Sequence, residues 1–171
     1  STQAKTLFPY TTLFRSNQVL SDTPLLFSKE HGAKQLPFSL DSYLLIIDTG
    51  VVGITKHTLE HVKDNLKTYK PYIDELGSIT KKVIKPLKEK NIDLIGEYMY
   101  KAHSLLKKIG VSHEKNDEVV ELCKNNNAKG AKLTGGGAGG CCICLCDTKE
   151  NALKIQDELK EKGYLSWMVT V

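Results

Sequence analysis

A dense cluster of glycines is the feature that most limits what this chain can fold into. Five of the six positions from Gly135 to Gly140 are glycine, and the sixth is Ala138. The cluster joins two short apolar segments, residues 131–134 and 141–146, each of which predicts a strand. A hairpin turn commonly needs only one or two glycines, so this density indicates a loop whose backbone approaches another group closely. Successive N–H groups in such a loop form an anion-binding nest, and we expect phosphate to be its ligand.

Two common phosphate-binding loops do not fit this context. Gly135, Gly137 and Gly140 match G-x-G-x-x-G, but the dinucleotide motif requires a helix after the glycines, and here a predicted strand follows. The P-loop requires Lys and Ser or Thr after its last glycine, where this chain has Cys141. A bulged hairpin connection with no ligand remains the structural alternative.

The order of predicted elements gives an α+β fold. Tyr43 to Ile47 form a continuous apolar run that predicts a buried strand, and PLLFSK and AKQLPFS flank a turn that predicts a hairpin. The other expected elements are helices at 55–67, from Pro71 to a kink or end at Pro86, 91–110, 112–124 and 151–162, and a last strand at 164–171. This order predicts a mostly antiparallel sheet, compatible with a ferredoxin-like core that carries added helices. Leu59, Val62 and Leu66 would form the apolar face of the first helix.

The first sixteen residues differ from the rest of the chain. The run TLFPYTTLFRS looks like translated sequencing-adapter read-through, so we interpret residues 1–16 as a non-native leader; a β-rich N-terminus is the alternative. Arg15, inside this run, is the only arginine among 24 basic residues. Because nucleic-acid binders depend on arginine, its scarcity argues against that class of partner.

The composition also bears on localisation. The sequence has no apolar stretch long enough for a membrane span and no signal-peptide pattern, so we expect no membrane partner. The crowding of Cys141, Cys142, Cys144 and Cys146 does not suit a secreted disulfide framework. Reduced thiols fit a cytoplasmic protein, which is the localisation we expect.

Three segments resemble a known family. AKLTGGGAGGC, residues 131–141, resembles the third motif of the GHMP kinases, and within them most closely the KLTGAGGGGC of archaeal-type mevalonate kinases. Gly136 stands where the family usually has Ala, and Ala138 where it usually has Gly. LLIIDTGVVGITK (44–56) and GVSHEKNDEVVELC (110–123) also resemble segments of those kinases, although Ile54 replaces a usual Ser.

The resemblance implies a domain arrangement and an activity. Residues 17–41 would end the N-terminal GHMP domain, and residues 42–171 would form the ferredoxin-like C-terminal domain. The parent enzyme would be a phosphotransferase that transfers the γ-phosphoryl group of ATP, with Mg²⁺, to the 5-hydroxyl of mevalonate in isoprenoid precursor synthesis. The catalytic Asp and the ATP loop of the family have no counterpart in this sequence. We therefore assign no catalytic residue, no metal ligand and no cofactor to the chain itself, and expect it to be inactive alone.

By the same resemblance, Gly135, Gly136, Gly137, Ala138, Gly139 and Gly140 would support the phosphate-binding loop, and Thr55 would lie on the substrate side. The implied partners are the N-terminal GHMP domain and mevalonate. A homodimer is a further expectation, although no sequence pattern indicates an oligomeric state. Alternatives are another GHMP kinase, such as a phosphomevalonate or homoserine kinase, and a non-catalytic ferredoxin-like module that binds a phosphorylated metabolite.

Other candidate sites have competing interpretations. Asp48-Thr49-Gly50 matches the start of an aspartic-protease signature, but such proteases are all-β, so we expect it only to end a strand. Thr55 could equally cap a helix. Cys142, Cys144 and Cys146 would share one strand face as buried small hydrophobes rather than bind a soft metal. His57 and His61 are spaced for metal binding but lack an H-E-x-x-H pattern, and Lys132 either approaches a phosphate or only flanks the strand.

Overall fold

The computed structural model describes residues 24–28, 32–36, 38–53 and 55–171. The chain divides between Ser39 and Leu40 into two compact units. Residues 1–16, interpreted above as a leader, lie outside the described residues. In the first unit, β1 (Leu25–Ser28) pairs with β2 (Gly32–Gln35) in antiparallel register, which confirms the predicted hairpin.

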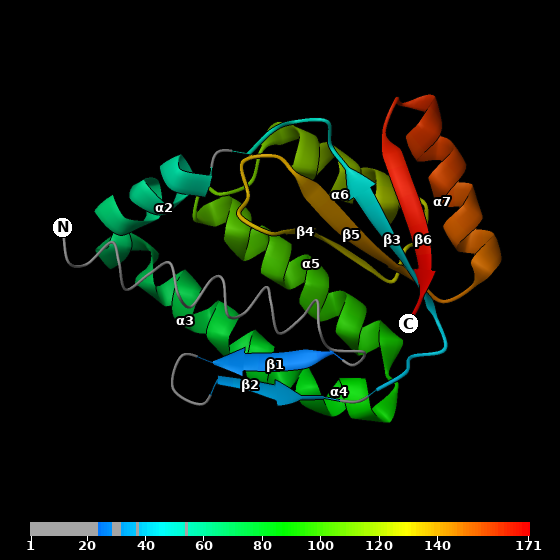
Figure 1. The fold of residues 1–171 in the computed structure, drawn as a ribbon, viewed down its shortest axis with the longest axis horizontal. Helices are drawn as coiled ribbons and strands as arrows, with labels where there is room; N and C mark the ends of the chain where they lie inside the picture. The colour runs from blue at the N-terminus through cyan, green and yellow to red at the C-terminus, as the bar shows by residue number, and fades with distance from the viewer. Residues whose placement is uncertain (1–23, 29–31, 37, 54) are drawn as a thin grey trace. The chain divides into compact units, whose positions relative to one another are not determined.

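The second unit is an α+β domain built on one four-stranded sheet (Figure 1). In chain order its elements are β3 (Tyr43–Asp48), α2 (Thr55–Asp64), α3 (Leu66–Lys82), α4 (Ile84–Glu89), α5 (Ile92–Lys108), α6 (Glu114–Asn125), β4 (Gly130–Thr134), β5 (Cys141–Cys146), α7 (Lys149–Glu161) and β6 (Leu165–Thr170). The strands lie in the order β4-β5-β3-β6, and all three pairings are antiparallel. This is the ferredoxin-like arrangement predicted above, with α2 to α5 added before α6.

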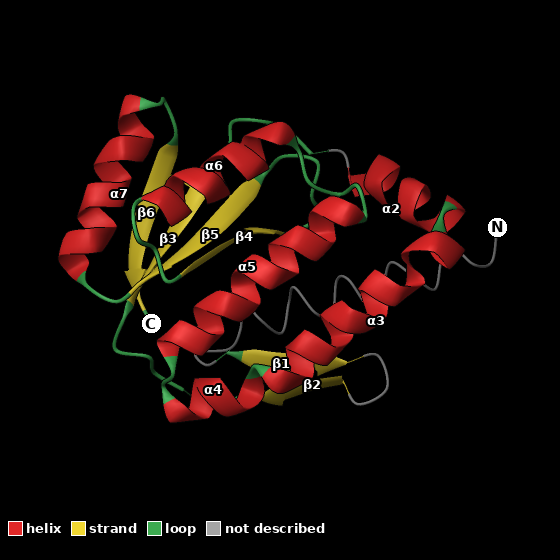
Figure 2. Ribbon diagram, turned by 180° about the vertical axis from the view of Figure 1, so that it is seen from behind, coloured by secondary structure: helices red, strands yellow, loops and turns green. Residues whose placement is uncertain are grey.

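Helices α6 and α7 cover one face of the sheet, as the view from behind shows (Figure 2). Strand residues that point to these helices alternate with residues that point away. On β3, Leu45 and Ile47 are fully buried, whereas Leu44 and Ile46 are only partly covered. On the edge strand β6 the outward side chains Leu165, Trp167 and Val169 are exposed by 64%, 53% and 40%. β3 is therefore buried on one face, not on both as its continuous apolar run suggested.

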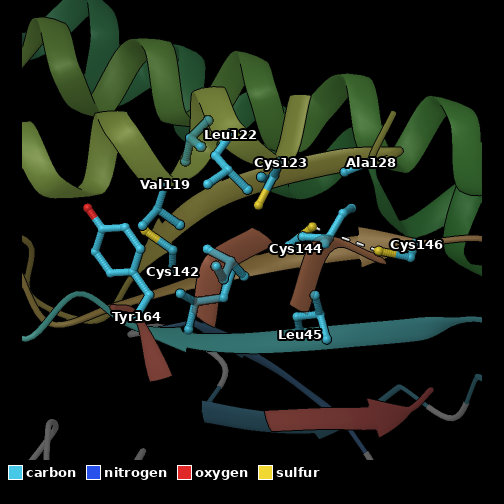
Figure 3. Close-up of a cluster of buried hydrophobic side chains, with 14 of the residues drawn as sticks. Leu45, Val119, Leu122, Cys123, Ala128, Cys142, Cys144, Cys146 and Tyr164 are labelled. Carbon is cyan, nitrogen blue, oxygen red and sulfur yellow. Dashed lines mark hydrogen bonds between the residues drawn. The ribbon is translucent and has the colours of Figure 1, made fainter. Parts of the chain in front are cut away.

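The core lies between the sheet and its helices and is rich in cysteine (Figure 3). Cys142, Cys144 and Cys146 project from the same face of β5, and Cys123 approaches them from α6. All four thiols are free and buried, which confirms their interpretation as small core residues. Burial raises the pKa of Cys142 to about 11, so its thiol is unreactive at neutral pH.

Helix ends in the second half of the domain follow their capping signals. Asn91 accepts the N–H of Leu94 at the start of α5, and Gly110, with φ of +78°, follows its end. α7 begins two residues before the predicted position, because the Thr148 side chain accepts the N–H of Asn151. Gly163, with φ of +83°, follows α7 as predicted.

The first helices differ from the prediction. α2 ends at Asp64, because Asn65 leaves helical geometry, with φ of −108° and ψ of 18°; its N–H and its side-chain amide both donate to the His61 carbonyl. α3 then runs from Leu66 through Pro71, which lies inside this helix rather than before it. The apolar face assigned to α2 is not buried within the described domain, since Leu59 and Leu66 are more than half exposed.

The expected break at Pro86 occurs three residues earlier. α3 ends at Lys82, and Pro86 lies in the first turn of α4, where no backbone N–H is required. A proline in a continuous helix would clash with the carbonyl of residue i−4, which here is Lys82. Pro86 therefore favours the break between α3 and α4, although Pro71 is accommodated inside α3.

Candidate functional site

The glycine cluster forms the connection between β4 and β5. Thr134 pairs with Cys141, so the hairpin closes directly around residues 135–140. Four glycines of this loop have positive φ, and Ala138 also adopts the left-handed conformation with φ of +56°. Glycine adopts these angles without the steric cost that other residues carry, which explains the density of glycine here.

Three hydrogen bonds hold the second half of the loop. Each of its last three N–H groups donates to a different segment: Ala138 to the Val111 carbonyl (2.8 Å), Gly139 to Asn116 Oδ1 (3.1 Å) and Gly140 to the Val51 carbonyl (2.7 Å). The residues after β3, the loop before α6 and α6 itself thus meet at the glycines. This half of the loop is anchored.

Close packing adds to these bonds. A Cβ atom on Gly137 would collide with the Val111 carbonyl, and one on Gly53 would collide with the Gly137 carbonyl. A Cβ atom on Gly139 would lie 2.6 Å from Val51 Cγ1. These glycines are therefore required by contact with protein backbone, independently of any ligand.

The first half of the loop is different. Gly135 and Gly136 are exposed, whereas Gly137 is buried against Val111. The N–H groups of Gly135 and Gly136 donate to no group in the described part of the chain. Gly135 has φ of +84° with open space where a Cβ atom would lie. Consecutive free N–H groups on a firmly held backbone suit a phosphate oxygen.

The end of β3 is fastened to the end of the same loop. Thr49 Oγ1 donates to the Gly140 carbonyl at 2.6 Å, and the Thr49 N–H donates to the same oxygen at 3.0 Å. Asp48 Oδ1 accepts the N–H of Gly50 at 2.9 Å. Asp48-Thr49-Gly50 therefore ends a strand and begins a turn in an α+β domain, as expected, and the all-β protease interpretation is wrong.

Thr55 is the first residue of α2, which follows the segment packed on the glycine loop. Its side chain is outside what the structure describes, so its capping and substrate-side roles stay predictions. His61 Nε2 lies 3.2 Å from the Ile109 carbonyl and 3.1 Å from the Tyr69 hydroxyl, and so links α2 to the end of α5. Among the described residues, no group of three or more His, Cys, Asp or Glu side chains is arranged to hold a metal ion.

A buried polar network lies beside the strand that leads into the loop. His103 Nδ1 accepts the N–H of Leu133 at 3.3 Å, so the neutral ring carries its proton on Nε2, 3.2 Å from Asp117 Oδ1. Burial lowers the pKa of His103 despite the opposing charge of Asp117. Burial would raise the pKa of Asp117, but hydrogen bonds from Lys107 and Ser112 hold it below its ordinary value. The neutral His103 ring thus accepts a hydrogen bond from a backbone N–H on the outer edge of β4.

Lys132 precedes this region on β4. Its Nζ donates to the Leu133 carbonyl at 2.7 Å, and burial lowers its pKa. The ammonium is thus directed to the protein backbone, which supports the flanking interpretation.

Asn116 and His103 were not singled out from the sequence. Asn116 occupies the same helix face as Val119, Val120 and Cys123, at spacings of three, four and seven residues. A polar residue on an apolar helix face is a recognisable signal of a buried hydrogen-bonding role. Such a signal could have identified Asn116, although not the loop that it contacts.

Comparison with known proteins agrees with this geometry. The family profile described as "GHMP kinases C terminal" matches residues 83–165. Mevalonate kinase of Saccharolobus solfataricus is 33% identical over 53% of this chain and 29% of its own length. Mevalonate kinase of Pyrococcus abyssi is 32% identical over 73% of this chain and 40% of its own length. The crystal structure of L. major mevalonate kinase in complex with R-mevalonate superposes with a TM-score of 0.78 and 25% identity, over 85% of this chain and 48% of that one.

The domain built on the four-stranded sheet has the fold of the GHMP kinase C-terminal domain, as the profile match and the superposed mevalonate kinase both show. Within that family, its sequence is similar to archaeal mevalonate kinases. The chain spans less than half the length of each of these three relatives. In the described residues, no helix is both long and apolar enough to cross a membrane.

Proposed function

We propose that this chain is the C-terminal part of a mevalonate kinase and contributes a backbone phosphate site to the active site of the parent enzyme. The parent would phosphorylate the 5-hydroxyl of mevalonate at the expense of ATP and Mg²⁺. One observation carries the proposal: the loop of residues 135–140 has an anchored second half, and it begins with two exposed residues, Gly135 and Gly136, whose N–H groups are free within the described chain. Similarity to mevalonate kinases supports the substrate.

In this role the chain's own groups bind and orient. The N–H groups of Gly135 and Gly136 would hold phosphate oxygens, while the bonds to Val111, Asn116 and Val51 would keep the loop from moving. Phosphoryl transfer depends on such positioning and on neutralisation of charge. By resemblance to the family, the acidic Mg²⁺ ligand and the catalytic Asp would come from the N-terminal GHMP domain.

The remaining expectations on localisation and assembly belong to the proposal as well. The parent would be cytoplasmic, residues 17–41 would end its N-terminal domain, and Thr55 would lie on the substrate side. Homodimerisation stays a prediction.

Two measurements test the proposal. We expect the gene upstream of codon 17 to encode a GLGSSA-type loop and a catalytic Asp; a start codon at that point would instead favour a non-catalytic phosphometabolite-binding module. We also expect no ADP release from the 171-residue chain with ATP, Mg²⁺ and mevalonate. Mevalonate-dependent ADP release by this chain would contradict the assignment of the catalytic groups to another domain.

The same enzyme assay separates substrates within the family. With the upstream half restored, we expect mevalonate to be phosphorylated in preference to phosphomevalonate or homoserine. A preference for either of those would support another GHMP kinase and leave the phosphate-site assignment intact.

A further inference from the structure

Asn116 is a fully buried polar side chain in the first turn of α6. Its neighbours on the same helix face, Val119 and Cys123, are fully buried apolar residues of the core. Burying an amide among such residues is unfavourable unless each of its polar atoms finds a partner. The partners of Asn116 therefore indicate why the position is polar.

Both ends of the amide are satisfied, and Gly139 is the shared partner. Oδ1 accepts the N–H groups of His113 and Gly139, each at 3.1 Å. Nδ2 donates to the Gly139 carbonyl at 3.1 Å and lies 3.4 Å from Cys142 Sγ. The side-chain amide therefore binds the N–H and the C=O of one residue, as a neighbouring strand would.

This contact differs from most other anchors of the loop. Val111 and Val51 hold Ala138 and Gly140 through their backbone carbonyls, which any residue could supply. Asn116 instead holds Gly139 through a side chain, and only a primary amide of this length both accepts from the N–H and donates to the C=O. A leucine here would fill a similar volume but leave both groups of Gly139 buried without partners.

We infer that Asn116 is a positioning residue for the phosphate-binding half of the loop. By fixing the Gly139 backbone, it holds the chain after Gly137 and so sets the direction of the free N–H groups of Gly135 and Gly136. Asn116 touches no ligand in this account and acts through the loop. The inference rests on the proposed function for its consequence, but the contact with Gly139 can be tested without any ligand.

The test compares Asn116→Leu with Asn126→Leu in the full 171-residue chain. Asn126 is a matched control, because it lies at the other end of α6 and donates its side-chain amide to the Leu122 carbonyl. Amide hydrogen exchange is measured by NMR without ligand, and inorganic pyrophosphate is then titrated. For Asn116→Leu we expect Gly139 to exchange about tenfold faster, with exchange at Leu133 in β4 unchanged, and pyrophosphate to bind about fivefold more weakly. The control should change neither value.

Two further measurements test the inference even if Asn116→Leu does not fold. Asn116→Asp keeps the acceptor for the Gly139 N–H, so it should restore part of the protection that the leucine variant loses. In the unmodified chain, a scalar coupling across the hydrogen bond should connect the Gly139 nitrogen to Asn116 Cγ, and its absence would overturn the inference.

The outcomes separate the inference from the proposed function. If the unmodified chain binds no pyrophosphate, the phosphate site is wrong, while the exchange of Gly139 still decides the role of Asn116. If the unmodified chain and Asn116→Leu bind pyrophosphate equally, Asn116 does not position the loop, and the phosphate site stands without it.

Discussion

Gly96 of α5 and Gly130 of β4 are in direct backbone contact. A Cβ atom on Gly96 would collide with the Lys129 carbonyl, and one on Gly130 would collide with Gly96 Cα. This contact brings α5 against the outer edge of β4, where Tyr100 donates to the Ala128 carbonyl and His103 accepts from Leu133. The edge strand that leads into the glycine loop is therefore covered by a helix.

Substitution of Gly96 tests the importance of this contact. We expect Gly96→Ala to destabilise the domain by about 3 kcal/mol, because a methyl group would force α5 away from β4. Gly77→Ala is the control, since Gly77 is an exposed residue within α3 with open space around it. It should stabilise the domain by up to about 1 kcal/mol through helix propensity. Urea unfolding of both variants measures the difference, and equal effects would refute the close contact.

The buried His103 predicts a loss of stability in mild acid. Its pKa is lowered by burial in the folded state, so the unfolded chain binds a proton more readily as the pH falls below about 6.5. Protonation would also remove the acceptor for the Leu133 N–H, while Lys107 and Lys132 nearby oppose the new charge. Unfolding free energies between pH 5 and pH 7 should therefore fall towards acid. His103→Gln should flatten this dependence, and an unchanged slope in that variant would show that another group is responsible.

Substitutions at the two positions where the loop departs from the family pattern should affect stability differently. Ala138 adopts φ of +56°, which is costly for a residue with a Cβ atom, so Ala138→Gly should stabilise the domain by up to about 1 kcal/mol. Gly136 is exposed and does not have positive φ, so Gly136→Ala should leave stability within about 1 kcal/mol. Thermal unfolding compares the two. A clear loss of stability in Ala138→Gly would contradict the described loop conformation.

The thiols should react according to their burial. Cys123, Cys142, Cys144 and Cys146 are buried, and only Cys141 is partly exposed. We expect iodoacetamide at pH 8 to modify no more than one thiol of the native chain, and all five cysteines after denaturation in urea. Mass spectrometry counts the adducts; rapid native modification of Cys142 would conflict with its position in the core.

Local sequence signals predicted the second half of the domain well. The segments on either side of the glycine loop form β4 and β5, as predicted. Asn91, Gly110 and Gly163 mark helix ends, as predicted. Both predictions succeed because strand alternation and helix capping depend on nearby residues. The predicted positions of the end of α2 and the start of α3 were wrong, because the chain leaves helical geometry only at Asn65 and Pro71 is accommodated inside α3. The internal division of the loop could not be predicted, because it depends on Val51, Val111 and Asn116, which are distant in the sequence.

The central claim is that the exposed half of the glycine loop binds phosphate through its backbone. Titration of the ¹⁵N-labelled chain with inorganic pyrophosphate, followed by NMR, tests it most directly. We predict saturable shifts of the Gly135 and Gly136 amides, with much smaller shifts for Ala138, Gly139 and Gly140, whose N–H groups are already bonded. Unchanged Gly135 and Gly136 amides at saturating pyrophosphate, or shifts confined to surface lysines elsewhere, would contradict the claim.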